Sequence, residues 1–217
     1  MKTKPLTFLL VLTFLFLFSG SSVVFAWELG ECEDAYLKQD YKTAHTCWLS
    51  LQTRLLTEKG WDTYQIFFGM MHELGQGISK DYKEAVKWYR LSAEQGNPHA
   101  RYKLGTMYYN GQGVPQDYKE AVRLFRLSAK IPDRRRDFNN WEMYKNGHPG
   151  GQLFLGIMYK DGEGVLQDYA LAHMWFNLCG SSGNKDCVKN RSMVEGKMTP
   201  QQIEKAQEMA RNWKPKK

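Results

Sequence analysis

The sequence lacks the short motifs that mark most metal, redox and nucleotide sites. His72-Glu73 begins a zinc-binding H-E-x-x-H motif, but Gln76 stands where the second histidine is needed. The other histidines show no ligand spacing, and no two of the four cysteines form a C-x-x-C pair. Gly-x-Gly pairs are present, but no predicted strand precedes them, so they are weak phosphate signals. We therefore predict no metal and no cofactor.

Long apolar runs are also scarce. Only residues 6–18 form one near the N-terminus, and it is too short to cross a membrane comfortably as a helix. Val24-Phe25-Ala26 then places small residues at the −3 and −1 positions of a cleavage site. We interpret residues 1–26 as a secretory signal peptide and Trp27 as the mature N-terminus; the alternative is an uncleaved membrane anchor. We expect an exported protein, periplasmic or secreted, without stable membrane insertion after cleavage.

Charge of one sign is not gathered in any long run. Removal of Lys2 and Lys4 with the signal peptide lowers the number of basic residues from 30 to 28, against 23 acidic residues, which gives a net charge of +5. An exported protein of this mild charge does not point to nucleic acid, and we predict no nucleic-acid partner. Acidic protein surfaces and anionic envelope polymers stay open as partners.

The few cysteines are even in number, which in an exported chain favours disulfides over metal sites. Cys32 and Cys47 lie almost symmetrically about the Gln39-Asp40 turn, so a helical hairpin would bring them together. Cys179 and Cys187 flank a Gly-Ser-Ser-Gly turn between two predicted helices. We predict both local pairings, each contributing roughly 3 kcal/mol to stability. The alternative is that the four cysteines are buried free thiols.

What the chain does contain is a pattern of about 36 residues, present three times. Gly69 and Gly105 are equivalent at a shift of 36, and Gly156 follows at a shift of 51. Fixed-period similarity predicts a solenoid, in which each unit buries its apolar face against its neighbours. We predict an all-α, right-handed α-solenoid of antiparallel helix pairs. Its repeats span residues 64–99, 100–150 and 151–183.

Each repeat is predicted to contain two helices joined by a tight turn. Asp81 and Glu84 have the spacing of a capping box at the start of the second helix. A glycine within the first helix, such as Gly105, costs ~1 kcal/mol relative to alanine. We attribute it to close approach of a small residue of the second helix, here Ala121. A Gly-x-Gly pair ends the first helix, where a C-cap requires positive φ.

The two ends depart from the pattern, as the caps of a solenoid do. Residues 27–63 echo the second-helix pattern only and are predicted to form a degenerate N-terminal repeat or cap. Residues 184–217 are predicted to form C-terminal capping helices. The last of these begins with Thr199 as N-cap and Pro200 at N1, and we expect it to cover the final repeat.

The repeat positions carry a recognisable signature. In the second repeat it consists of Ala100, Leu104-Gly105, Tyr108, Gly111-x-Gly113-Val114, Asp117-Tyr118, Ala121, Phe125 and Ala129. This signature resembles the Sel-one-like repeat (SLR) family, relatives of the tetratricopeptide repeats, and the resemblance covers nearly all of the mature chain. It implies a curved scaffold that binds proteins or peptides in envelope, secretion or signalling assemblies.

One internal segment is not required by the repeat, the insertion at residues 131–145. It combines arginines with aromatic residues, the types that dominate binding hot spots. These partner-binding candidates are Arg134, Arg135, Arg136, Phe138, Trp141 and Tyr144. The alternative is a long solvated loop that folds back over a repeat edge.

The concave face is the second candidate surface, because solenoids usually hold their ligands there. Lys103, Thr106 and Tyr109 occupy positions of the first helix that the repeat pattern does not fix. We predict that they line the groove; the alternative is an ordinary solvated helix face.

The leading hypothesis for function is therefore an exported adaptor that binds a protein or peptide, with no catalytic residue. One alternative is a β-lactamase-like hydrolase, since Ser182 and Lys185 fit S-x-x-K. Neither S-D-N nor K-T-G accompanies that match. Another alternative is a structural subunit of an envelope secretion or motor complex, which would co-purify stably with its assembly.

Overall fold

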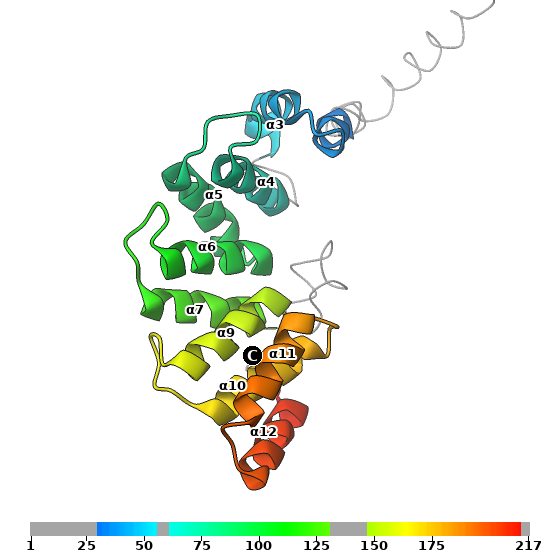
Figure 1. Ribbon diagram of the computed structural model, residues 1–217. Helices are drawn as coiled ribbons and strands as arrows, with labels where there is room; N and C mark the ends of the chain where they lie inside the picture. The colour runs from blue at the N-terminus through cyan, green and yellow to red at the C-terminus, as the bar shows by residue number, and fades with distance from the viewer. Residues whose placement is uncertain (1–29, 56–60, 131–146, 214–217) are drawn as a thin grey trace, which may run out of the picture.

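The computed structural model describes residues 30–55, 61–130 and 147–213, and within these ranges it contains helices and no strand. After a helical segment at residues 30–37, the helices are α3 (Tyr41–Leu55), α4 (Trp61–Leu74), α5 (Tyr82–Glu94), α6 (Pro98–Asn110), α7 (Tyr118–Ala129), α9 (Pro149–Asp161), α10 (Tyr169–Gly180), α11 (Lys185–Glu195) and α12 (Pro200–Asn212). Figure 1 shows them stacked in chain order into an elongated solenoid. The predicted all-α solenoid is confirmed.

Aspartate begins the second helix of each repeat. At α5, Asp81 Oδ1 accepts hydrogen bonds from the backbone N–H groups of Lys83 (2.9 Å) and Glu84 (3.1 Å). The predicted capping box is wrong, because the Glu84 carboxylate pairs with Lys87 Nζ at 2.7 Å. The Asp81 N–H, which would donate to Glu84 in a capping box, donates to the His72 carbonyl at 2.9 Å. The cap therefore also fastens the second helix to the end of the first.

The glycine within each first helix lies against an aromatic ring, and not against the predicted alanine. The three contacts are Gly69 with Tyr89, Gly105 with Phe125, and Gly156 with Phe176; a Cβ added to any of these glycines would come within 2.7 Å of a ring atom. Ala121 is fully buried, but it is not among the nearest atoms to Gly105. Glycine is required because the second helix places its largest fully buried side chain here.

The second glycine of each turn makes the contact between successive repeats. Gly113 adopts φ +73°, and a Cβ added there would lie 2.3 Å from the Tyr82 carbonyl oxygen at the start of the previous second helix. Gly164 approaches the Tyr118 carbonyl oxygen in the same way, at 2.5 Å. Both the backbone conformation and the space therefore exclude a side chain.

Each end of the described solenoid is fastened by a local disulfide. Cys32 is bonded to Cys47, and Cys179 to Cys187, which are the two predicted pairs. At the C-terminal end α12 covers the last repeat, where Trp213 packs edge-on against Trp175 with ring centroids 5.5 Å apart. No helix in the described ranges has the length and apolar content to cross a bilayer.

The predicted signal peptide (residues 1–26) and insertion (residues 131–145) both lie outside the described residues. The six binding candidates of the insertion, Arg134, Arg135, Arg136, Phe138, Trp141 and Tyr144, fall in this range and stay predictions.

Candidate partner-binding surfaces

The predicted groove residues of α6 lie where one repeat meets the next. Lys103 Nζ contacts Glu73 Oε2 of α4 at 2.9 Å, and the two side chains are only 20% and 18% exposed. Glu73 also accepts a hydrogen bond from the Tyr89 hydroxyl. The Thr106 hydroxyl donates to the Lys103 carbonyl of its own helix at 2.7 Å. Lys103 and Thr106 thus already have partners within the solenoid.

Tyr109 joins α6 to the third repeat. Its ring lies 5.3 Å from the rings of both Tyr118 and Phe154, measured between centroids. Burial raises the pKa of Tyr109 to about 12, and its hydrogen bond to Glu163 acts in the same direction. The contribution of Lys103, Thr106 and Tyr109 to partner binding stays a prediction, but each contributes a contact inside the fold.

A different hollow opens on the second helix of the middle repeat. It is a cavity of about 430 Å³ between α7 and the turn that joins α9 to α10, and we call it the α7 groove. The described residues that line it are Lys119, Val122, Arg123, Arg126, Leu127, Lys130, Gly164 and Val165, of which four are cationic and none is acidic. The basic residues recur at helical spacing, so they form one stripe along α7.

The cations of the α7 groove differ in how far they are already paired. Arg123 makes a bidentate contact with Glu120, through hydrogen bonds of 2.7 Å to each oxygen, and this raises the pKa of Arg123. Arg126 donates to the Tyr159 hydroxyl at 2.6 Å, a neutral partner that leaves its charge uncompensated. Among the described residues, no carboxylate pairs with Lys119 or Lys130.

The sequence analysis does not predict this groove, although the spacing of its four cations indicates one of its walls. The i, i+4, i+7, i+11 spacing of the α7 cations could have been found in the printed sequence. The opposite wall could not, because Gly164 and Val165 come from the turn of the following repeat.

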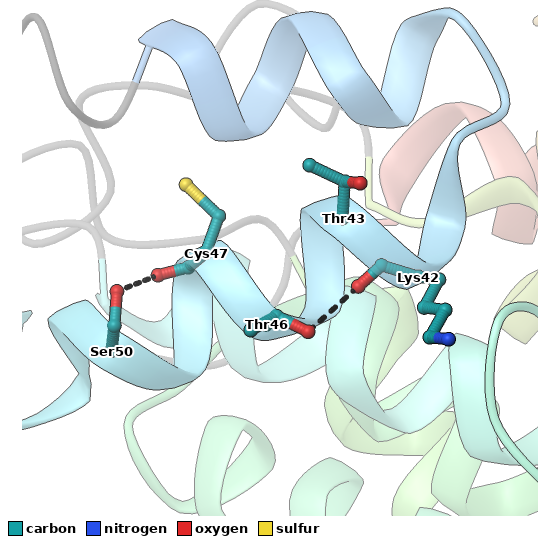
Figure 2. Close-up of a pocket in the computed structure, with 5 residues that line it drawn as sticks. All are labelled: Lys42, Thr43, Thr46, Cys47 and Ser50. Carbon is teal, nitrogen blue, oxygen red and sulfur yellow. Dashed lines mark hydrogen bonds between the residues drawn. The ribbon is translucent and has the colours of Figure 1, made fainter.

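A second hollow, of about 570 Å³, lies on α3 beside the first disulfide. Figure 2 shows its lining residues Lys42, Thr43, Thr46, Cys47 and Ser50 along one face of that helix. The Thr46 and Ser50 hydroxyls donate to carbonyls of α3 itself, at 3.0 and 2.7 Å. Its polar groups are thus largely occupied, and a single cation offers little to select a partner.

A buried histidine pair joins α6 to α9. His148 is the N-cap of α9, and its Nδ1 accepts from the Gly151 N–H, so its Nε2 carries the proton. That N–H donates to His99 Nδ1 at 3.1 Å. Burial lowers the pKa of His148 to about 3 and that of His99 to about 4. Both rings are therefore neutral at pH 7.

The chemistry for metal binding or acyl transfer is not assembled in the described residues. They contain no group of three or more His, Cys, Asp or Glu side chains able to hold a metal ion. The Ser182 hydroxyl donates to the Cys179 carbonyl of its own turn at 2.6 Å, and not to a general base. This geometry does not favour the hydrolase hypothesis.

The comparisons with known proteins agree with the repeat architecture. The family model described as Sel1 repeat matches residues 64–97, 98–131 and 149–184. Among curated proteins, no relative matches this chain.

Two similar solved structures bear on the fold. One is a protective antigen present in uropathogenic Escherichia coli strains that displays an SLR fold; identity is 29% and the TM-score 0.56, over 68% of this chain and 27% of the antigen. The other is a Sel1 repeat protein from Oxalobacter formigenes; identity is 23% and the TM-score 0.58, over 75% of this chain and 59% of that protein. This chain thus spans about a quarter of the antigen and somewhat over half of the Oxalobacter protein.

Proposed function

Because the chain is a Sel1-repeat protein, we propose that it is an exported scaffold that binds a protein or peptide segment through its solenoid surface. Sel1-repeat proteins generally serve as protein–protein interaction scaffolds, and the family is typically non-catalytic. The proposal adds where binding takes place: the α7 groove is the principal contact surface on the described part of the chain.

The observation that carries this proposal is how the repeat residues are used. The signature glycines and aromatic residues are consumed in stacking, as Gly105 against Phe125 illustrates. One cation of the α7 groove, Arg126, donates to the Tyr159 hydroxyl of the next repeat, but Lys119 and Lys130 pair with no carboxylate among the described residues. The groove is a preformed hollow with an apolar floor and a charged rim. Preformed surfaces bind without an ordering cost, which is how solenoids reach useful affinity.

Two observations support export. Two local disulfides are compatible with an oxidising compartment, where such bonds persist. The sequence of residues 1–26 has the organisation of a secretory signal. Mass spectrometry of the protein from envelope fractions would test this, since a mature chain should begin at Trp27.

A pull-down from envelope extract tests the scaffold itself. The bait is residues 27–217, beside a variant with Lys119→Glu and Lys130→Glu and a variant that lacks residues 131–145. A control with Lys189→Glu and Lys205→Glu carries the same change in net charge on exposed positions of α11 and α12. Each captured protein is then purified and its direct binding measured.

The expected result is a partner held by the wild type and the control, and lost from the α7 variant. Loss only on deletion of residues 131–145 would move the site to the insertion. Absence of any directly binding partner would contradict the scaffold proposal. Stable recovery of one multiprotein assembly would identify the chain as a structural subunit.

A further inference from the structure

We infer that the α7 groove holds a short acidic peptide segment, in extended conformation, with at least one apolar side chain on the groove floor. This inference rests on the proposed scaffold function and adds the chemistry of the occupant. A scaffold could bind many kinds of surface; the charge, floor and length of this groove restrict the choice.

The charge of the groove selects carboxylates. Glu120 compensates only Arg123, so Lys119, Arg126 and Lys130 present a net positive rim to solvent. Arg126 is held in place by the Tyr159 hydroxyl, which fixes its guanidinium without neutralising it. The Arg126 guanidinium can bind an Asp or Glu carboxylate through its planar N–H groups, and the ammonium groups of Lys119 and Lys130 attract carboxylates as point charges.

The floor of the groove selects a peptide over a polyanion. Val122 is buried, and Leu127 and Val165 are half-buried, so apolar atoms lie between the cations. Leu166, the next residue in the turn, is 91% exposed. Phosphate and sulfate polymers have nothing to bury against such atoms, whereas a Leu or Val of a peptide gains about 25 cal/mol for each Å² of apolar surface covered.

The length of the stripe sets the length of the segment. Lys119 in the first turn of α7 and Lys130 at its C-cap are eleven residues apart, and that separation is about 16 Å at the rise of an α-helix. An extended peptide covers this distance with about five or six residues at ~3.3 Å each. The segment should therefore carry acidic residues at both ends and its apolar residue between them.

The preceding repeat shows why α7 and not α5 is the site. Lys83, Lys87 and Arg90 of α5 are equivalent to the first three cations of α7, at the shift of 36. Glu94, however, stands where α7 has Lys130. The α5 stripe therefore ends in an acidic residue, which repels a second carboxylate and shortens the site.

The test is fluorescence anisotropy with residues 27–217 and a labelled peptide, Asp-Asp-Leu-Val-Glu-Glu. The comparison peptide is the uncharged Asn-Asn-Leu-Val-Gln-Gln, and a third peptide replaces Leu-Val with Ser-Ser. We expect saturable binding of the acidic peptide that weakens as salt is raised. Compared with the acidic peptide on the wild-type protein, the affinity should be about tenfold or more lower for the uncharged peptide, and equally for the acidic peptide on the Lys119→Glu/Lys130→Glu variant. The Ser-Ser peptide should bind about threefold or more weakly.

Three results would overturn the inference: equal affinity in the α7 variant, an equal loss in the Lys189→Glu/Lys205→Glu control, or tighter binding to anionic phospholipid vesicles than to the acidic peptide. Circular dichroism spectra show whether the variants keep the wild-type fold, which these exposed substitutions should not disturb. If the peptide fails while the pull-down yields a direct partner lost from the α7 variant, the occupant chemistry is wrong and the scaffold stands. If no partner is recovered, the scaffold proposal itself fails.

Discussion

The junction between the first and second repeats and the junction between the second and third use equivalent positions with opposite chemistry. At the first junction, Glu73 of α4 accepts hydrogen bonds from Tyr89 of α5 and Lys103 of α6. This polar cluster is largely covered, since Glu73 and Lys103 are each about one-fifth exposed.

At the second junction the same three positions are aromatic. Tyr109, Phe125 and Phe154 correspond to Glu73, Tyr89 and Lys103. Phe125 and Phe154 stack with centroids 4.9 Å apart, and Tyr109 meets Phe154 at 5.3 Å. The comparison teaches that the signature glycines fix the backbone contact between units, while the side-chain contacts at these three positions can be either ionic or aromatic.

The largest effect is expected at a contact that lies within each repeat and that all three repeats share, the glycine beneath the ring. Gly105→Ala would force the buried Phe125 ring to move, because the new Cβ would lie 2.7 Å from it. Overpacking of this kind costs about 2 kcal/mol. Urea denaturation should show the loss as a lower midpoint.

The control for Gly105→Ala is Gly196→Ala, where the nearest atom to a new Cβ lies at an ordinary 3.6 Å. Phe125→Leu in the Gly105→Ala background should recover part of the loss, since the smaller side chain makes room. An unchanged midpoint for Gly105→Ala would show that the ring contact has no role in requiring glycine.

Exchange of chemistry between the junctions tests whether they are interchangeable. Glu73→Tyr alone leaves Lys103 without its acceptor, and Lys103→Phe alone leaves Glu73 without its cation. Each single substitution should lower the free energy of unfolding by about 1–2 kcal/mol. The double variant, which copies the second junction, should recover at least half of the summed loss.

The measurement is a double-mutant cycle by chemical denaturation. A double variant whose loss equals the sum of the two single losses would show that the side chains at these positions do not interact. Gly196→Ala again serves as a reference for a substitution outside both junctions.

The smallest effect concerns pH and the second junction only. Burial lowers the pKa of His148 to about 3 in the folded chain, whereas an unfolded histidine has a pKa of about 6.5. Between these two pH values the unfolded chain binds more protons than the folded chain. Stability is therefore full above about pH 6.5 and decreases as the pH falls. His148→Asn copies Asn97 at the equivalent cap of α6. When the pH falls from 7 to 5.5, the free energy of unfolding of this variant should decrease by about 1 kcal/mol less than that of the wild type.

Thermal denaturation at pH 7 and pH 5.5 checks this expectation. Asparagine keeps the N-cap, so a loss at both pH values would indicate a packing role for the ring and no titration effect. His99 responds to the same change, since burial and the nearby Lys103 lower its pKa to about 4, against the opposing influence of Glu73.

Much of the fold could be predicted from the sequence, because helix length, caps and turns are local. The N-cap residues Asp81 and Thr199 and the two cysteine pairs are recognised from residues near them in the sequence, and the structure has them as expected, although Asp81 forms no capping box with Glu84. The prediction that Ala121 contacts Gly105 is wrong, because periodicity gives the face of a helix and not the register between two helices. Phe125 and Ala121 are both on the buried face, and only packing separates them.

The candidate surface was harder to predict for a related reason. Glu73 and Lys103 are thirty residues apart, and nothing local indicates that they pair. The same holds for the α7 groove, whose walls come from two repeats. The signature does not fix Lys103, Thr106 and Tyr109, but a position that the signature leaves variable can still be partly buried by contacts within the fold.

The second glycine of each turn has a consequence for how such chains change in length. Gly113 receives the Tyr82 carbonyl of the previous unit, and Gly164 receives that of Tyr118. One unit thus carries both parts of this contact: a glycine that faces the preceding unit and a tyrosine carbonyl that faces the following unit. Duplication or loss of one whole 36-residue unit in a gene would leave a matched glycine–carbonyl contact on each side. Solenoids of this kind can therefore be lengthened or shortened, by evolution or by design, one unit at a time.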